Sequence, residues 1–232
     1  MKPAPLARPH RIALIVPSSN TVMENDLHGG LPKHAFTVHT DRMYLVETTR
    51  EAETRMIEEF AEQAAKDLGT LKPDLLVFGC TSAGSLFGLD GDQKVCARLG
   101  ELAGCPTLGV INAVDRALKR VDARRVAVLT PYNEDLTRSV AQAVAQGRTI
   151  VGAFGMGITD NVALADPSPE DICAFAAEKL TGLAFDTVLV SCTNFRALDA
   201  RSALSTMFSV PVVTSNSAVL DAIREAFPEV LA

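Results

Sequence analysis

The chain of 232 residues repeats one pattern twice, at a spacing close to half of its own length. Arg11–Pro17 (RIALIVP) is echoed by Arg125–Pro131 (RVAVLTP), and the turn around Cys80 (FGCTS) is echoed by the turn around Cys192 (VSCTN). The second copy of these two patterns lies 112–114 residues after the first. So long an interval indicates a duplicated lobe rather than a solenoid, whose repeats are about 20–50 residues long.

Short apolar runs alternate with segments of helical periodicity along the whole chain. The alternation predicts an α/β fold, in which helices cover both faces of a parallel sheet. With the duplication, this gives two pseudo-symmetric, doubly wound lobes, each with a parallel four-stranded sheet. The predicted strands are 11–16, 36–43, 74–79, 106–110, 125–130, 149–155, 186–191 and 210–213. The clearest predicted helices are 49–68, 134–145, 170–180 and 216–226.

The polar segment Arg120–Arg125 is the best candidate for the crossing between the lobes. If the last helix packs back onto the first lobe, that lobe is discontinuous in sequence. We therefore expect a first lobe of residues 11–120 plus 215–232, a second lobe of residues 121–214, and an active site in the cleft between them.

Composition excludes several classes of function. The 22 Lys and Arg residues against 28 Asp and Glu residues give a net charge of −6, whereas nucleic-acid binders carry a basic face. No apolar stretch approaches the roughly 18 residues of a membrane span. Residues 1–10 lack the apolar run of a signal peptide and predict a loose tail. Five cysteines, an odd number, fit a reducing compartment, so we expect a cytoplasmic protein without nucleic-acid or membrane partners.

Cys80 and Cys192 each follow a predicted buried strand. The carboxyl ends of parallel strands are where open α/β sheets bind ligands. Backbone N–H groups and a following helix start would lower the thiol pKa and favour the thiolate. Free cysteine is also an ordinary small core residue, and this is our interpretation of Cys96, Cys105 and Cys173. Two cysteines at equivalent repeat positions instead predict a reaction centre with two sulfurs.

Polar loops follow the first strand of each repeat and reach the same predicted edge. Ser18, Ser19, Asn20 and Tyr132 can donate hydrogen bonds to a carboxylate or an enolate oxygen. Helix capping is the alternative role for Ser and Asn, and the two roles are compatible. The glycines of Gly152–Gly157 lack the spacing of a dinucleotide loop, and the four histidines lack zinc-ligand spacing. No cofactor and no metal is therefore expected.

Val16–Glu24 (VPSSNTVME) and Gly79–Ser82 (GCTS), with the paired cysteines, resemble the aspartate/glutamate racemase superfamily, within it the maleate cis-trans isomerase and arylmalonate decarboxylase group. The resemblance covers nearly all of the chain after its first ten residues. It implies a cofactor-independent enzyme that acts on a small carboxylate and often forms homodimers. By this resemblance, Cys80 is the nucleophile and Cys192 the proton donor or acceptor.

The same resemblance implies roles for the polar residues. Asn20 would bind a substrate carboxylate, Tyr132 would donate to it, and Asn161 would assist from the second lobe. The complete set of expected substrate-binding residues is Ser18, Asn20, Thr81, Ser82, Tyr132, Asn161, Thr193 and Asn194.

Departures from the family patterns rank the possible activities. Arylmalonate decarboxylases keep only the second cysteine and have glycine at the first, whereas Cys80 is present here. No histidine follows Cys192 closely, in contrast to many amino-acid racemases, and Thr193–Asp199 looks closer to less characterised relatives, including proteins linked to ectoine utilisation. We therefore expect an isomerase of the maleate-to-fumarate type that works through a cysteine adduct and an enediolate. The alternatives are a racemase, a decarboxylase, or a non-catalytic protein that binds small acids.

Overall fold

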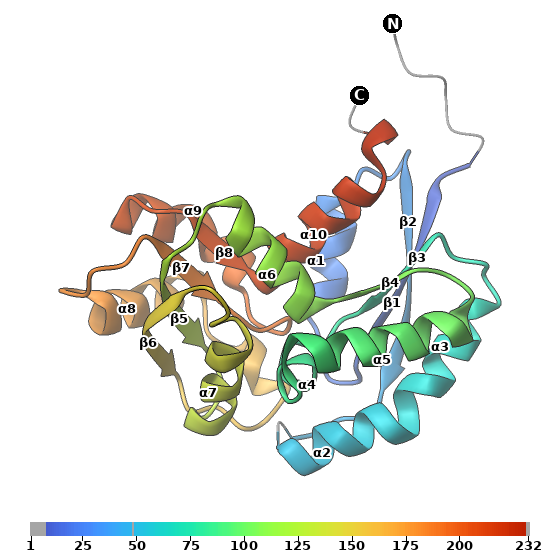
Figure 1. Ribbon diagram of the computed structural model, residues 1–232, viewed down its shortest axis with the longest axis horizontal. Coiled ribbons are helices and arrows are strands. Elements are labelled where there is room, and N and C mark those ends of the chain that lie inside the picture. Colours follow the sequence, from blue (N-terminus) through green and yellow to red (C-terminus); the bar gives the residue numbers. More distant parts are fainter. Residues whose placement is uncertain (1–7, 48, 231–232) are drawn as a thin grey trace, which may run out of the picture.

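Two parallel four-stranded sheets form the centre of the computed structural model, which describes residues 8–47 and 49–230 (Figure 1). The strand order is β2-β1-β3-β4 in the first sheet and β6-β5-β7-β8 in the second, so the two sheets share one topology. The strands are β1 His10–Pro17, β2 Phe36–Met43, β3 Leu75–Phe78, β4 Thr107–Gly109, β5 Arg125–Thr130, β6 Thr149–Gly155, β7 Thr187–Val190 and β8 Val212–Thr214. All eight predicted strands and the predicted fold class are confirmed.

The inner strands are buried on both faces, which is why each appears in the sequence as an unbroken apolar run. In β1, Leu14 pairs with Val77 of β3, and in β5, Val128 pairs with Leu189 of β7. In each sheet the chain leaves the first strand toward one side and returns to the other side in the third strand. The loops after β1 and β3, and after β5 and β7, therefore flank the point where ligands bind in open α/β sheets.

Helices cover both sheets. The first half contains α1 Met23–Gly30, α2 Arg50–Arg55, the π-helical turn η1 Met56–Ala61, α3 Glu62–Gly69, α4 Thr81–Ser85, α5 Gly88–Ala103 and α6 Val110–Arg120. The second half contains α7 Glu134–Ala143, the 3-10 turn η2 Ala163–Ala165, α8 Pro169–Leu180, α9 Ala197–Phe208, α10 Ser215–Ala226 and the 3-10 turn η3 Pro228–Val230. The predicted helix 49–68 is thus three consecutive segments, α2, η1 and α3.

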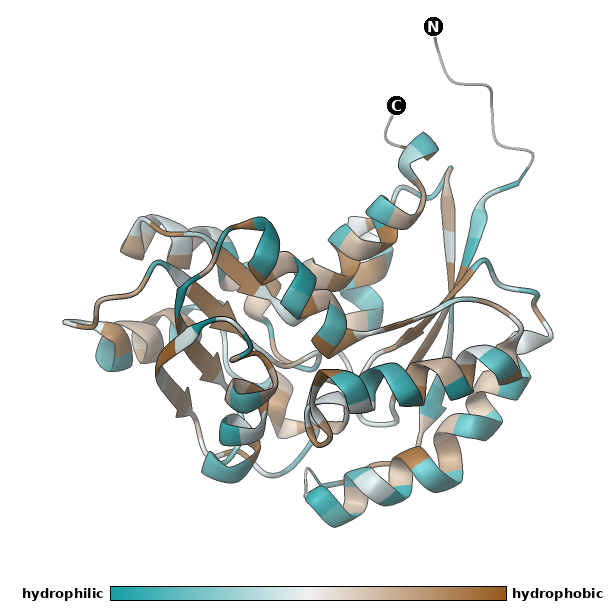
Figure 2. Cartoon of the chain, in the orientation of Figure 1, coloured by the Kyte–Doolittle hydropathy of each residue, from teal (hydrophilic) through white to brown (hydrophobic). Residues whose placement is uncertain are grey.

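Helix boundaries follow local side-chain chemistry. The Thr49 hydroxyl accepts a hydrogen bond from the Ala52 N–H at the start of α2. Ser168 and Asp171 form a reciprocal capping box at the start of α8, where Pro169 occupies the first turn. Figure 2 shows the apolar residues concentrated on the strands, with hydrophilic positions on the outer faces of the helices.

The last helix, α10, packs on α6 and α1 (Figure 1). Arg120 and Asp221 form an ion pair at 3.1 Å, and the Arg224 guanidinium donates to the Gly30 carbonyl at 2.7 Å. These contacts join the end of the chain to its first half. The assignment of residues 215–232 to the first lobe, with 121–214 as the second, remains our proposal, and residues 231–232 lie outside the described residues.

The predicted loose tail, residues 1–10, is only partly covered, because residues 1–7 lie outside the described residues. For residues 8–10 the prediction is wrong. Arg8 makes two hydrogen bonds to the Asp74 carboxylate, at 2.7 and 2.9 Å, and His10 begins β1. Within the described ranges, no helix is long and apolar enough to cross a membrane.

Candidate active site

The two strand-end cysteines meet where the two sheets face each other. Cys80 follows β3 and is 3% exposed, and Cys192 follows β7 and is 2% exposed. The Thr193 hydroxyl donates to the Gly79 carbonyl at 3.1 Å, so residues adjoining the two cysteines are in direct contact. The structure therefore brings together the two sulfurs that the duplication paired.

Side-chain amides connect the two halves around the sulfurs. The Asn20 amide donates to the Thr193 hydroxyl at 3.2 Å, and the Asn161 amide donates to the Ser19 hydroxyl at 2.5 Å. Asn194 accepts from the Thr21 N–H at 2.8 Å and donates to the Asn161 carbonyl at 2.6 Å. All three asparagines thus lie at the predicted site, with their amides engaged by protein partners. Their role in binding a carboxylate stays a prediction, and it requires these hydrogen bonds to change partners.

The remaining predicted hydroxyl groups lie around the same centre. Ser18 exchanges hydrogen bonds with the backbone of Leu45, which fixes the loop after β1 against the segment after β2. Thr81 donates to the Ser215 hydroxyl at 3.0 Å. The Ser82 hydroxyl lies 3.7 Å from the Cys80 sulfur. Ser82 is therefore the predicted hydroxyl placed to exchange a proton with Cys80.

Tyr132 is fully enclosed and its phenol lies against Cys192. A hydrogen bond from this phenol and one from the Asn194 N–H, at 3.2 Å, both reach the Cys192 sulfur. Burial nevertheless dominates, and it raises the pKa of Cys192 to about 12. Burial likewise raises the pKa of Tyr132 well above its usual value. The phenol is therefore a neutral donor at physiological pH, as the prediction for Tyr132 requires.

The expectation that the local backbone keeps these cysteines as thiolates is wrong. Burial, reinforced by the charge of Glu53, raises the pKa of Cys80. Cys80 caps α4, a helix of five residues, and Cys192 is followed by a turn rather than a helix, since α9 starts at Ala197. The loss of hydration outweighs the few backbone dipoles available. The raised pKa values favour the protonated thiols, so Cys80 needs a partner to take its proton before it can act as the predicted nucleophile.

Glu53 is one of the site residues that sequence reasoning missed. It lies on α2 and is 0% exposed, and neither carboxylate oxygen has a hydrogen-bond partner. Burial raises its pKa to about 8, while the nearby Ser82 hydroxyl and the charge of Arg50 act in the opposite direction. The one available signal is its spacing: Glu53 precedes Met56, Phe60 and Ala64 on the apolar face of the helix, where a carboxylate is out of place.

The start of α10 also contributes buried polar groups that were not predicted. The Ser215 hydroxyl lies 3.2 Å from that of Ser191, and the Asn216 amide donates to the Thr193 carbonyl at 3.1 Å. The same amide donates to Asp26 at 2.7 Å, where burial raises the carboxyl pKa to about 6. These groups form hydrogen bonds that fix the segment Ser191–Thr193 against the start of α10.

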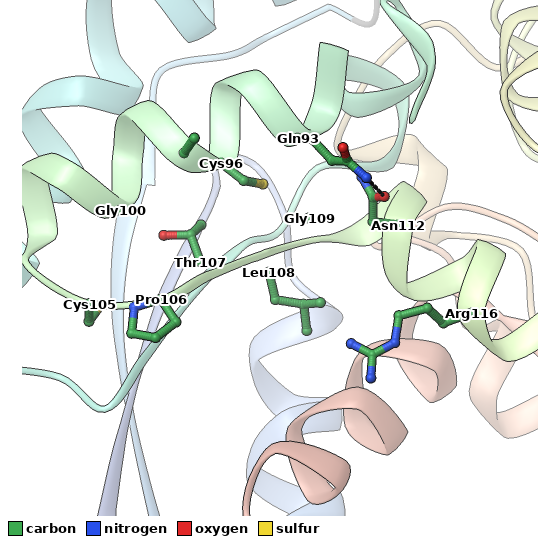
Figure 3. Close-up of a pocket in the computed structure, with 11 residues that line it drawn as sticks. Gln93, Cys96, Gly100, Cys105, Pro106, Thr107, Leu108, Gly109, Asn112 and Arg116 are labelled. Atoms are coloured by element: carbon green, nitrogen blue, oxygen red, sulfur yellow. Dashed lines mark hydrogen bonds between the residues drawn. The ribbon is translucent and has the colours of Figure 1, made fainter. Parts of the chain in front are cut away.

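A surface hollow of about 510 Å³ lies away from this centre, between α5, β4 and α6 (Figure 3). Its lining includes Cys96 and Cys105 but neither strand-end cysteine. The Asn112 amide at its rim is held by Asp92, and Arg116 pairs with Glu225 at 2.9 Å. Asn112 and Arg116 are thus engaged by the protein, whereas the hydroxyl of the lining residue Thr107 has no hydrogen-bond partner, and Cys96 and Cys105 remain predicted packing residues.

Comparison with known proteins places this geometry in a family. The profile of the arylmalonate decarboxylase family matches residues 12–229. The chain belongs to this family. The match spans both sheets and all of the elements that carry the paired cysteines.

Two curated relatives in this group are maleate isomerases. The one from Geobacillus stearothermophilus is 26% identical over 223 residues, which is 90% of this chain and 88% of the relative. The one from Pseudomonas putida KT2440 is 28% identical over 231 residues, which is 94% of this chain and 91% of the relative. Among solved structures, a maleate isomerase variant from Pseudomonas putida S16 with maleate superimposes with a TM-score of 0.88 at 24% identity, covering 94% of this chain and 92% of that one. That structure has the same fold.

Proposed function

We propose that this protein is a cofactor-independent isomerase that converts a small cis-unsaturated dicarboxylate of the maleate type into its trans isomer. The observation that carries the proposal is the meeting of two buried thiols, Cys80 and Cys192, at equivalent strand ends of a duplicated fold. The curated maleate isomerases, which align with about nine-tenths of the chain, support the same reaction.

In the proposed mechanism, the sulfur of Cys80 adds to one carbon of the substrate double bond. The electron pair of that bond moves into the adjacent carboxylate, which becomes an enediolate. The former double bond is now single and rotates. The electrons then return, the carbon–sulfur bond breaks, and the trans acid leaves. Cysteine suits this role because sulfur is intrinsically nucleophilic and leaves readily.

Cys192 and its neighbours act on the charge that develops in the adduct. Cys192 would stabilise the carbanionic carbon or protonate it reversibly, and a proton that it delivers returns to its sulfur before the carbon–sulfur bond breaks. The Tyr132 phenol and the Asn20 amide would donate to the carboxylates, and one preorganised donor of this kind contributes about 3 kcal/mol to transition-state stabilisation. Because the site is enclosed, each such interaction is stronger than it would be in water.

Cys80 favours isomerisation over decarboxylation. A decarboxylase needs a single proton donor after carbon dioxide is lost, which Cys192 alone could supply. Isomerisation also needs a nucleophile that can add and leave, and Cys80 supplies it. A racemase would use both thiols to exchange an α-proton, and solvent deuterium would then enter the product.

Proton NMR in heavy water tests the proposal directly. The purified protein is incubated with maleate, aspartate, glutamate, methylmalonate and phenylmalonate in separate samples. The expected result is conversion of maleate to fumarate, which stops in the Cys80→Ala variant. Deuterium incorporation into an amino acid, loss of carbon dioxide, or no change in maleate would each overturn the isomerase assignment.

A further inference from the structure

A buried carboxyl group beside the two thiols is left unexplained by the mechanism above. Glu53 is completely enclosed, and neither of its oxygens has a partner at full hydrogen-bond geometry, although the Ser82 hydroxyl lies near enough to act on the carboxyl. Buried polar groups without partners are rare, because their lost hydration is not repaid. A carboxylic acid kept in such a place, on a helix face otherwise apolar, calls for a functional reason.

Ser82 lies between Glu53 and the nucleophile. Its hydroxyl is 3.7 Å from the Cys80 sulfur and close enough to Glu53 to act on the charge of that carboxyl. A hydroxyl both donates and accepts a proton. Ser82 is thus near both Cys80 and Glu53, and a small movement that brings its hydroxyl into hydrogen bonds with both would let a proton pass from sulfur to carboxylate.

We infer that Glu53 is the proton acceptor for the Cys80 thiol, acting through the Ser82 hydroxyl. This inference rests on the proposed function for the identity of the electrophile, whereas the proton transfer itself requires only the three side chains. Glu53 is in this sense a positioning residue for the nucleophile, since it contacts the sulfur by way of Ser82.

The step balances in protons and electrons. As the Cys80 sulfur bonds to the olefinic carbon, the S–H bond breaks and its proton passes to Ser82. The Ser82 hydroxyl proton passes in turn to the Glu53 carboxylate. The olefinic electron pair moves into the substrate carboxylate. When the carbon–sulfur bond breaks again, the proton returns from Glu53 to the sulfur, so no external acid, base or redox partner is consumed.

The charged and titratable groups that interact with Glu53 leave it suited to this role. Arg50 on its own helix favours the ionised carboxylate. Cys80, Cys192 and Tyr132 face it from three other loops, and all three have pKa values raised by burial. With a pKa of about 8, Glu53 therefore titrates at a lower pH than any of these three groups, and it is a stronger base than an ordinary glutamate.

The helix that contains Glu53 is followed directly by the π-helical turn η1. The turn begins at Met56, three residues after Glu53, and interrupts what would otherwise be one continuous α-helix from α2 to α3. Single π-turns inside helices are frequent at functional sites. The widened turn thus starts within one helical turn of the residue for which we infer a role.

The test is the rate at which iodoacetamide alkylates Cys80, followed by peptide mass spectrometry from pH 6 to 10. This readout does not depend on which acid is the substrate, so it stays informative if maleate proves wrong. In the unaltered protein the rate should rise through about pH 8, the pKa of Glu53. In Glu53→Gln it should fall by about 10²-fold near pH 8, the lower range for general-base effects, with the rise moved to higher pH.

Two variants serve as controls. Glu51→Gln changes an exposed carboxyl on the same helix and should leave both the rate and its pH dependence unchanged. Glu53→Asp keeps a carboxylate and should restore part of the rate together with a titration near neutrality. Circular dichroism and thermal unfolding establish that each variant is folded before rates are compared.

Three results would overturn the inference. An unchanged pH profile in Glu53→Gln would mean that another group takes the proton. A lower rate with the original profile would assign Glu53 to packing alone. Faster turnover of maleate by Glu53→Gln above pH 8 would mean instead that protonated Glu53 donates a hydrogen bond to the substrate.

Discussion

The two halves of this chain share a strand order but give their cysteines different surroundings. Cys80 has a hydroxyl and a carboxyl nearby, Ser82 and Glu53, and both can take a proton. Cys192 instead receives hydrogen bonds from Tyr132 and from the backbone of Asn194. The comparison teaches that the duplication placed the two cysteines at equivalent positions, and that different neighbouring side chains give the two sulfurs different chemical environments. We assign the sulfur beside an acceptor to addition, and the sulfur beside donors to proton delivery.

The halves also differ in what joins their second and third strands. In the first half this connection contains the helix from α2 to α3, with its π-helical turn. In the second half it contains a shorter helix, α8, preceded by a long loop. That loop reaches across to the first half, where the Asn161 N–H donates to the Val46 carbonyl at 3.1 Å. One half therefore contributes a buried carboxyl to the centre, and the other contributes a loop that contacts the segment after β2.

The largest effect is expected from Cys80→Ala. Loss of the nucleophile should reduce turnover of the preferred substrate by more than about 10⁴-fold, because no neighbouring group can form the adduct. Fluorescence-monitored unfolding and kinetic assays on the same preparation separate lost chemistry from lost structure. Retained activity in this variant would remove Cys80 from the nucleophile role.

Cys192→Ala should reduce turnover by a smaller factor, about 10²–10⁴-fold, as expected for loss of a general acid. Addition by Cys80 remains possible, so a substrate–Cys80 adduct should accumulate. Intact-protein mass spectrometry after rapid quenching would detect it as the mass of one added substrate. Equal losses in the two cysteine variants, without any adduct, would argue against the proposed division of roles.

Arg148→Met tests whether the two halves depend on each other for stability. Arg148 precedes β6 and forms a buried ion pair with Asp115 of α6, at 2.7 Å, with both side chains less than a tenth exposed. Removing Arg148 should cost about 1–3 kcal/mol, because Asp115 loses one buried partner but keeps its ion pair with Lys119 at 2.6 Å. Urea unfolding should show this as a lower midpoint in one cooperative transition. A second, separate transition would instead mean that the halves unfold independently.

Glu53→Gln should change stability in a pH-dependent manner that Glu51→Gln does not share. The pKa of Glu53 is about 8 in the folded protein against a usual 4.5, so the folded state binds the proton more tightly. Stability therefore falls as pH rises from about 4.5 to 8, and the loss is complete above 8. The glutamine variant escapes this loss, which is on the order of a few kcal/mol. Melting temperatures at pH 5 and 8.5 measure it, and parallel shifts in both proteins would contradict it.

The strands and the cysteine pair could be predicted from the sequence because each has a local signal. Strands buried on both faces, such as β3 and β7, leave unbroken apolar runs, and a duplicated chain reveals its equivalent positions by alignment with itself. The helices α4 and α5 are harder to delimit, because small and polar residues at their starts obscure the apolar period.

The electrostatics of the centre could not be predicted in the same way. A cysteine at a strand end looks activated when only its neighbours in sequence are considered. The pKa of the thiol depends on how completely other segments of the chain exclude water from it. Those segments can be distant in sequence, as the hydrogen bond between Asn20 and Thr193, 173 residues apart, illustrates. The role of Glu53 could not be predicted for a related reason. Glu51, Glu58 and Glu59 lie close to it in the sequence and are exposed, whereas Glu53 is buried.

The hydrogen bonds made by Asn20, Asn161 and Asn194 affect how tightly the closed protein can bind its substrate. Because Cys80 and Cys192 are 2–3% exposed, we expect a dicarboxylate to reach them in those molecules where these hydrogen bonds are broken. The apparent affinity is then the intrinsic affinity multiplied by the fraction of molecules that is open. Weakening the amide contacts should therefore tighten apparent binding while exposing the enediolate to water. The three asparagines thus determine the balance between tighter apparent substrate binding and better protection of the enediolate from water.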